Sequence, residues 1–196
     1  MKRVIIVHCW DGTPESCWYP WLKRELTPKR IHVVIPAMPE SDAPKQALSV
    51  PKLHEVIGEP DEELILVGHS VGCITILRYL ESLEPGQRVA GVILVAGYTD
   101  AIGFDELKNF YQTPIDWIKI RSHCDAFVAI YSDDDPFVPV IHAEIFREQL
   151  GARLIEKPGM GHFSALADKR EHCVEFPDVR DAVESIYDGL GILSQG

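Results

Sequence analysis

One segment, Gly68-His69-Ser70-Val71-Gly72, constrains the fold of this chain more than any other feature. It directly follows the apolar run Leu64–Val67 and precedes a stretch with helical periodicity. Gly-x-Ser-x-Gly between a buried strand and a helix is typical of a nucleophile elbow, a turn so sharp that the serine hydroxyl is exposed at a strained apex. Glycines flank the serine because side chains there would clash where the strand and the helix cross. The segment therefore predicts a strand–turn–helix unit with Ser70 at its tip.

Short apolar runs rich in β-branched residues alternate with longer helical stretches along the whole chain. The runs are hydrophobic almost without interruption, which indicates strands covered on both faces, as in a parallel sheet. We expect six strands, at Val4–His8, Ile31–Ile35, Leu64–Val67, Val92–Ala96, Ala126–Tyr131 and Arg153–Glu156. We expect helices near 16–26, 45–57, 71–82, 105–110, 139–150 and 178–190. This βαβα order predicts a doubly wound α/β fold, and the 196 residues are most simply one domain spanning 1–196.

Charge and composition disfavour several classes of partner. The net charge is −11 and no block of Lys or Arg is present, which argues against nucleic acid and anionic membrane surfaces. No segment approaches the roughly 18 apolar residues of a membrane span, and the first apolar run is too brief for a signal peptide. The five cysteines are scattered without a Cys-x-x-Cys pair, which favours free thiols in a reducing compartment. We therefore expect a cytoplasmic protein, and the sequence leaves its oligomeric state open.

Polar residues suited to acyl transfer follow three of the predicted strands. Ser70 follows the third strand, Asp133-Asp134-Asp135 the fifth, and His162 the sixth. Ligands bind beyond the carboxyl ends of the strands in an open α/β sheet, and Ser, Asp, His is the chain order of α/β-hydrolase triads. The pattern predicts a serine nucleophile, a histidine that takes and returns its proton, and a carboxylate that orients the imidazole.

Residue type alone does not identify which of the three adjacent aspartates is the triad carboxylate. At least two of them must be solvated loop residues. A metal site is disfavoured because no histidine or carboxylate partner stands nearby at metal-ligand spacing. We therefore expect no metal and no cofactor.

An acyl-transfer site also needs donors for the oxyanion of its transition state. One is expected from the backbone N–H of Val71, at the start of the helix after the nucleophile. The other is expected from the loop after the first strand, at Trp10. His8 is expected to shape that loop, and Cys9 to pack within it, with an oxidation-sensitive thiol as the alternative for Cys9.

The connection Gly97–Cys124 is longer than the others and contains several aromatic residues. Connections of this length are often lids or substrate walls. A short helix packed against the edge of the sheet is an equally favoured interpretation.

Several blocks together give the chain a resemblance to a small serine-hydrolase family that includes retinoblastoma-binding protein nine and its bacterial relatives. The matching blocks are Trp18–Leu26, Gly68–Gly72, Asp134–Pro139 and Gly161–Phe163. The resemblance covers essentially the full length. It implies a compact three-layer α/β-hydrolase fold with a mostly parallel six-stranded sheet and no large cap domain. It also implies Ser70 as nucleophile, Asp135 as acid and His162 as base, because Asp135 heads an Asp-Pro-x-Val-Pro turn like the family's.

Two positions depart from the family pattern. Cys9 stands where many relatives have glycine, which bears on the geometry of the oxyanion loop. The stretch Glu171-His172-Cys173-Val174-Glu175 lacks the leucine of the retinoblastoma-pocket motif Leu-x-Cys-x-Glu, so a retinoblastoma-type partner is not expected.

The residues and the resemblance together predict a metal-free serine hydrolase that acts through an acyl-enzyme on small ester, thioester or amide substrates. A carboxylesterase is favoured, and peptidase or amidase activity stays open. The alternative is a protein-interaction module on a hydrolase scaffold with vestigial or slow activity.

Overall fold

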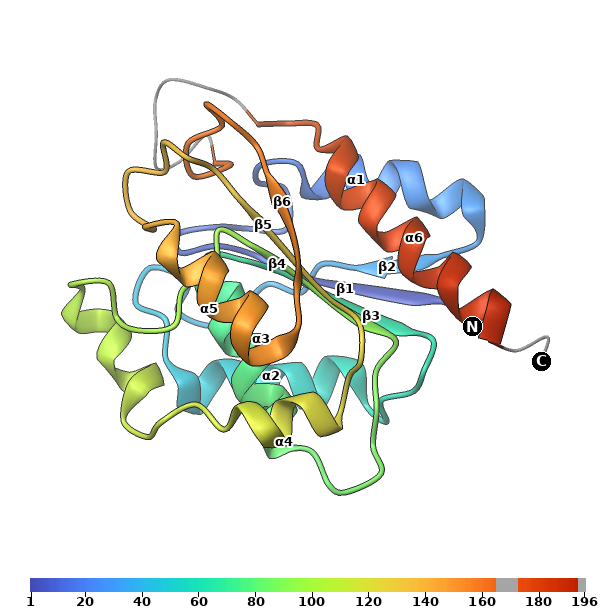
Figure 1. Cartoon of the computed structure of the whole chain (residues 1–196), viewed down its shortest axis with the longest axis horizontal. Helices are drawn as coiled ribbons and strands as arrows, with labels where there is room; N and C mark the ends of the chain where they lie inside the picture. The colour runs from blue at the N-terminus through green and yellow to red at the C-terminus, as the bar shows by residue number, and fades with distance from the viewer. Residues whose placement is uncertain (165–172, 194–196) are drawn as a thin grey trace.

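The computed structural model describes residues 1–164 and 173–193, and these contain a single all-parallel sheet (Figure 1). Its strands lie in the order β2-β1-β3-β4-β5-β6. The strands are β1 (Arg3–Val7), β2 (His32–Val34), β3 (Leu64–His69), β4 (Gly91–Val95), β5 (Phe127–Tyr131) and β6 (Arg153–Glu156). The predicted strands are confirmed, and the sheet is parallel throughout rather than mostly parallel.

Helices cover both faces of the sheet, which gives the expected three-layer α/β fold (Figure 1). They are α1 (Tyr19–Leu26), α2 (Gln46–Ile57), α3 (Val71–Ser82), α4 (Trp117–Ser122), α5 (Ile141–Leu150) and α6 (Pro177–Leu193), with the 3₁₀ helices η1 (Thr27–Lys29) and η2 (Asp105–Tyr111). Helices α1 and α6 pack on one face, and α2, α3, α4 and α5 contribute to the core on the other. The connection from β4 to β5 holds only η2 and α4, so the described ranges carry no separate cap domain.

The sequence did not predict helix α4 or the short 3₁₀ helix η1, and the helix expected near 105–110 is the 3₁₀ helix η2. Helix α4 has six residues, too few for a clear apolar periodicity, and only Ile120 is buried. Its start is fixed by Asp116, whose side chain accepts a hydrogen bond from the backbone N–H of Lys119. Helix α1 also begins later than predicted, at Tyr19, because Cys17 has a left-handed backbone with φ of 52° that a helix cannot include.

The order of the strands defines where a ligand can bind. Strand β1 lies between β2 and β3. The chain first adds β2 on one side of β1 and then adds β3 and the later strands on the other side. A crevice forms at such a switch point beyond the carboxyl ends of the strands. The loop after β1 and the turn after β3 meet there, since Val7 pairs with Gly68. Within residues 1–164 and 173–193, no helix is both long and apolar enough to cross a membrane.

Replacing Gly72 by alanine should destabilise the protein by about 3 kcal/mol, because an added Cβ would lie 2.2 Å from the backbone oxygen of Val7. Gly189 in α6 is the matched control, since a Cβ there meets nothing within 4 Å. Gly189→Ala should raise the stability by about 0.5–1 kcal/mol through helix propensity. Urea unfolding of the three proteins measures both changes. An unaltered midpoint for Gly72→Ala would contradict the close crossing of α3 and β1.

Candidate active site

Ser70 stands at the apex of the turn between β3 and α3, in a strained backbone conformation with φ of 57° and ψ of −120°. Its backbone N–H donates to the oxygen of Val95 at 2.9 Å, and its backbone oxygen accepts from the N–H of Cys73 at 2.9 Å. A Cβ on Gly68 would lie 2.7 Å from the backbone nitrogen of Cys73, so this glycine is required by close packing. The strand–turn–helix unit predicted from the sequence therefore holds Ser70 at the carboxyl edge of the sheet.

Asp135 and His162 are brought together by the loops that follow β5 and β6. The Nδ1 of His162 donates to Asp135 Oδ2 at 2.8 Å, and both side chains are buried. The other carboxylate oxygen of Asp135 accepts from the backbone N–H groups of Phe137 and Val138, at 2.9 and 3.1 Å. These three hydrogen bonds fix the carboxylate as an acceptor and leave Nε2 of His162 as the nitrogen available to the pocket.

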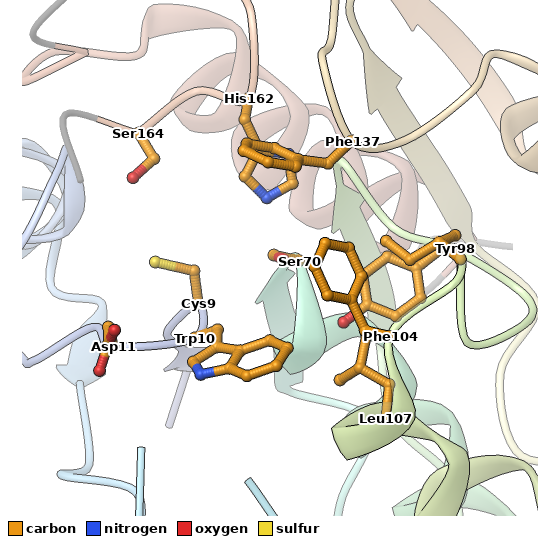
Figure 2. A pocket seen from close by; sticks show the side chains of 11 residues that line it. Cys9, Trp10, Asp11, Ser70, Tyr98, Phe104, Leu107, Phe137, His162 and Ser164 are labelled. Carbon is orange, nitrogen blue, oxygen red and sulfur yellow. The ribbon is translucent and has the colours of Figure 1, made fainter. Parts of the chain in front are cut away.

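Ser70 and His162 line the same cavity, with the His162 ring directed towards the Ser70 side chain (Figure 2). Among the described residues, no direct hydrogen bond joins the Ser70 hydroxyl to the His162 ring. Catalytic hydrogen bonds are often long without substrate and shorten when it binds. The arrangement thus offers a hydroxyl, an imidazole and a carboxylate in sequence.

Asp133 and Asp134 hold the loop that carries His162. Asp133 Oδ1 accepts from the backbone N–H of Gly159 at 2.9 Å, and Asp134 Oδ1 accepts from that of Gly161 at 2.8 Å. Each bond is charge-assisted and crosses from the β5 loop to the β6 loop. The sequence did not predict this role, because bonds to backbone atoms leave no signal in residue type.

A buried series of hydrogen bonds connects the loop after β1 with the loop of His162. The N–H of Cys9 donates to Tyr19 Oη at 3.0 Å, and Tyr19 Oη lies 2.7 Å from Nδ1 of His69. His69 Nε2 lies 2.8 Å from the backbone oxygen of His162. Since a carbonyl oxygen only accepts, Nε2 carries the hydrogen and Nδ1 of a neutral ring accepts from Tyr19. Burial raises the pKa of Tyr19 well above its usual range, so its hydroxyl keeps the hydrogen to donate.

His8 holds the loop after β1 from its other side. Its Nε2 accepts from the N–H of Met38 at 3.0 Å, so Nδ1 carries the hydrogen and donates to the backbone oxygen of Cys9 at 2.9 Å. Burial lowers the pKa of His8, which favours this neutral ring. The contacts give His8 the shaping role that the sequence suggested.

The loop after β1 turns tightly without strain at Cys9. Asp11 carries the left-handed backbone, with φ of 55°. The N–H of Gly12 donates to the oxygen of Cys9 at 3.0 Å, and a Cβ on Gly12 would lie 2.8 Å from that oxygen. Cysteine in place of glycine at position 9 therefore leaves the turn intact.

Of the expected oxyanion donors, Trp10 lines the same cavity as Ser70, and Val71 follows Ser70 as the first residue of α3. Trp10 lines the cavity, and its indole Nε1 donates to the backbone oxygen of Asp42 at 2.8 Å. Within residues 1–164 and 173–193, the backbone N–H of Trp10 and that of Val71 have no acceptor. Both are available to a ligand.

The cavity has a volume of about 250 Å³ and is mainly apolar (Figure 2). Its apolar wall consists of Trp10, Tyr98, Ile102, Phe104, Leu107 and Phe137. Trp10 and Phe104 meet edge to face with ring centroids 5.8 Å apart. The connection Gly97–Cys124 supplies one wall of the cavity and also folds into η2 and α4, which contact α3 rather than an edge strand of the sheet. That this wall contacts a substrate stays a prediction.

The stretch that resembles the retinoblastoma-pocket motif is only partly covered by the structure. Glu171 and His172 lie outside the described residues. Val174 is exposed, and Cys173 is buried.

Comparisons with known proteins give matches along most of the chain. The family model described as serine hydrolase matches residues 4–173. YdeN of Bacillus subtilis strain 168 is 32% identical over 187 residues, 95% of this chain and 96% of YdeN. The serine hydrolase RBBP9 of Rattus norvegicus is 28% identical over 149 residues, 74% of this chain and 77% of RBBP9.

Solved structures match the fold as well. The crystal structure of the B. subtilis ydeN gene product has a TM-score of 0.89 at 30% identity, covering 96% of this chain and 100% of that chain. Est1E of Butyrivibrio proteoclasticus has a TM-score of 0.72 at 14% identity, over 95% of this chain and 86% of Est1E, and supports the fold alone.

Replacing Tyr19 by phenylalanine should destabilise the protein by about 1–3 kcal/mol, because the Cys9 N–H and His69 Nδ1 would lose their buried partner. Tyr131→Phe is the matched control, since its hydroxyl makes one exposed 3.4 Å contact with Glu156. That change should stay within about 0.5 kcal/mol. Equal losses in urea unfolding for the two variants would argue against a structural role for the buried series.

Proposed function

Because the chain belongs to the serine hydrolase family, we propose that it hydrolyses small esters through a covalent acyl-enzyme on Ser70. In this proposal His162 is the general base and Asp135 the carboxylate that orients it. The observation that carries the proposal is the 2.8 Å hydrogen bond from His162 Nδ1 to Asp135, at the cavity that Ser70 lines. Thioesters and amides are attacked by the same chemistry and form the wider substrate class.

The acylation step follows from the positions of these groups. Ser70 Oγ attacks the substrate carbonyl carbon while Nε2 of His162 takes its proton. Asp135 stabilises the imidazolium and keeps its orientation. When the tetrahedral intermediate collapses, the bond to the leaving group breaks and His162 gives the proton to the departing oxygen, sulfur or nitrogen. Ser70 then carries the acyl group.

Deacylation repeats these roles with water as the nucleophile. His162 takes a proton from water, the resulting hydroxide attacks the acyl carbon, and the ester bond to Ser70 breaks. The proton returns to Ser70 Oγ and the carboxylic acid leaves. No step in this proposal calls on a metal or a cofactor.

The developing oxyanion would accept hydrogen bonds from the backbone N–H groups of Trp10 and Val71. The second donor begins α3, so the positive end of the helix dipole adds to the attraction. Losing one such donor typically costs about 3 kcal/mol of barrier. Backbone donors do not reorganise during the reaction, which makes the rigidity of the loop after β1 part of the proposed catalysis.

The cavity favours a small, apolar acyl group. One side of the cavity is lined by apolar side chains from the loop after β1 and from the start of η2, namely Trp10, Phe104 and Leu107. The volume of about 250 Å³ lies below the usual range of drug-sized sites. With a net charge of −11, we further propose a small-molecule partner rather than nucleic acid or a membrane surface.

Fluorophosphonate labelling tests the nucleophile. We expect one adduct, on Ser70, in the folded protein and none in Ser70→Ala. Absence of an adduct in folded wild-type protein would contradict the proposal. A labelled Ser70 without turnover over a broad panel of esters, thioesters and amides would favour the interaction-module alternative.

Two aspartate variants test the carboxylate. Asp135→Asn should lower kcat by about 10³–10⁴-fold because it no longer fixes the required imidazole tautomer. Asp133→Asn removes a charge two residues before Asp135, at a side chain that contacts the backbone of Gly159. It should lower kcat by less than about tenfold. The hydrolysis of nitrophenyl butyrate measures kcat for both variants. A larger loss of kcat in Asp133→Asn than in Asp135→Asn would contradict the assignment of Asp135 as the triad carboxylate.

Enlarging the wall should broaden the range of acyl chains. Phe104→Ala should raise kcat/KM for an octanoyl ester about tenfold relative to a butyryl ester, because each accommodated methylene contributes about 0.8 kcal/mol. Ile118→Ala on α4 is the control, since that side chain is 85% exposed and does not line the cavity. An unchanged chain-length profile in Phe104→Ala would place the acyl group elsewhere.

A further inference from the structure

Two cysteines and a histidine gather at the edge of the cavity. Cys9 comes from the loop after β1, Cys17 from the turn before α1 and His69 from the end of β3. The two Sγ atoms and a ring nitrogen of His69 all lie within 4.8 Å of one another. Cys17 Sγ also lies 3.6 Å from the hydroxyl of Ser164.

The two thiols have different environments. Cys9 is buried, whereas Cys17 is half-buried and so accessible to a small reagent from solvent. The nearby thiol of Cys9 lowers the pKa of Cys17, and the contact with the Ser164 hydroxyl acts in the same direction against the effect of burial. The proximity of Cys17, together with burial, raises the pKa of Cys9. Because Cys17 is the more exposed of the two thiols and its pKa is the lower, Cys17 is the one that reacts first with a reagent from solvent.

Metal binding is a poorer use of this cluster. Both ring nitrogens of His69 are already engaged, Nδ1 with Tyr19 Oη at 2.7 Å and Nε2 with the oxygen of His162 at 2.8 Å. A metal on either nitrogen would break one of these buried hydrogen bonds. The sulfur atoms can react with each other without disturbing His69.

We propose that Cys9 and Cys17 form an oxidisable dithiol, which a hydroperoxide converts into an intramolecular disulfide. The Cys17 thiolate attacks one oxygen of the peroxide, the O–O bond breaks, and the other oxygen leaves as an alkoxide or hydroxide that takes up a proton. Cys17 is then a sulfenic acid. The sulfur of Cys9 gives up its proton and attacks the Cys17 sulfur, the S–O bond breaks, and hydroxide leaves with that proton as water. Two thiols are oxidised and one peroxide is reduced by two electrons.

The disulfide would act on the loop next to Ser70. The Cys9 N–H donates to Tyr19 Oη, the Cys9 oxygen accepts from Gly12, and the next residue is Trp10. A covalent S–S bond is much shorter than a contact between two thiols, so closing it displaces this loop. The displacement moves the Trp10 N–H away from the oxyanion, and hydrolysis slows reversibly. This consequence, unlike the disulfide itself, rests on the proposed function.

Mass spectrometry of peroxide-treated protein tests the disulfide directly. Both cysteines lie on the tryptic peptide Val4–Lys23, and a further cut after Glu15 separates them. In treated wild-type protein we expect the two fragments to stay joined until a reductant is added. Cys17→Ser should lack the joined fragments, whereas Cys124→Ser, which alters a buried thiol outside the cluster, should keep them.

Activity is followed in the same samples. Treated wild-type protein should lose at least tenfold in kcat/KM for a short-chain ester and recover it with dithiothreitol. Cys17→Ser should have unchanged basal activity and resist the treatment. A joined fragment without any basal hydrolysis would support the dithiol and count against the proposed function alone.

Three results would overturn the dithiol. The first is that Cys9 and Cys17 stay reduced at peroxide concentrations that oxidise Cys73, Cys124 or Cys173. The second is oxidation of Cys17 to a sulfinic acid with no joined fragments. The third is a stoichiometric zinc ion, found by elemental analysis of the purified protein, that protects both thiols in wild-type protein and is lost in Cys17→Ser.

Discussion

The crossing of α3 over the end of β1 determines where the proposed nucleophile can stand. Only a residue without a side chain fits at Gly72, because an added Cβ would lie 2.2 Å from the oxygen of Val7. On the other side, the oxygen of Val95 in β4 holds the N–H of Ser70. The left-handed backbone of Ser70 persists because these buried neighbours leave the turn no room to relax. The order of β1, β3 and β4 in the sheet is therefore a requirement of the site.

The proposed base depends on hydrogen bonds to backbone atoms of its loop. Asp133 and Asp134 hold Gly159 and Gly161, and His69 binds the oxygen of His162. Three adjacent carboxylates would repel one another, but each accepts from at least one backbone N–H and so has its charge partly offset. These aspartates therefore hold the loops after β5 and β6 in place relative to each other, and the carboxylate of Asp135 is positioned in advance for its hydrogen bond with His162.

The sequence predicted the elements whose pattern is strong. Buried parallel strands are continuous apolar runs, and the elbow has a short motif that needs close packing on both sides of the serine. The choice of Asp135 among three aspartates required the family resemblance, because their chemistry is identical and only the turn geometry distinguishes them. The pattern missed α4, which has six residues and depends on the Asp116 cap.

Contacts between distant parts of the chain left no readable signal. Tyr19 and His69 are 50 residues apart, and an aromatic residue on the apolar face of a helix is first interpreted as core. The same holds for Cys17, whose neighbours Cys9 and Ser164 belong to separate loops. Such pairs form only in the folded chain, where the loops at the carboxyl edge of the sheet lie next to one another.

Cys9 illustrates how one position can serve packing and chemistry together. Its backbone makes the hydrogen bonds that shape the proposed oxyanion loop, and the left-handed residue of that loop is Asp11. The loop geometry therefore does not require a sulfur. Cys17 holds a left-handed backbone that costs of order 1–2 kcal/mol for a residue with a side chain, yet it brings a second sulfur to the first. Cys9 therefore takes part both in the backbone hydrogen bonds of the loop after β1 and in the pair of sulfur atoms. Because Trp10 is the next residue and lines the cavity with Ser70, a change in the bonding of the Cys9 side chain is expected to shift the backbone of Trp10.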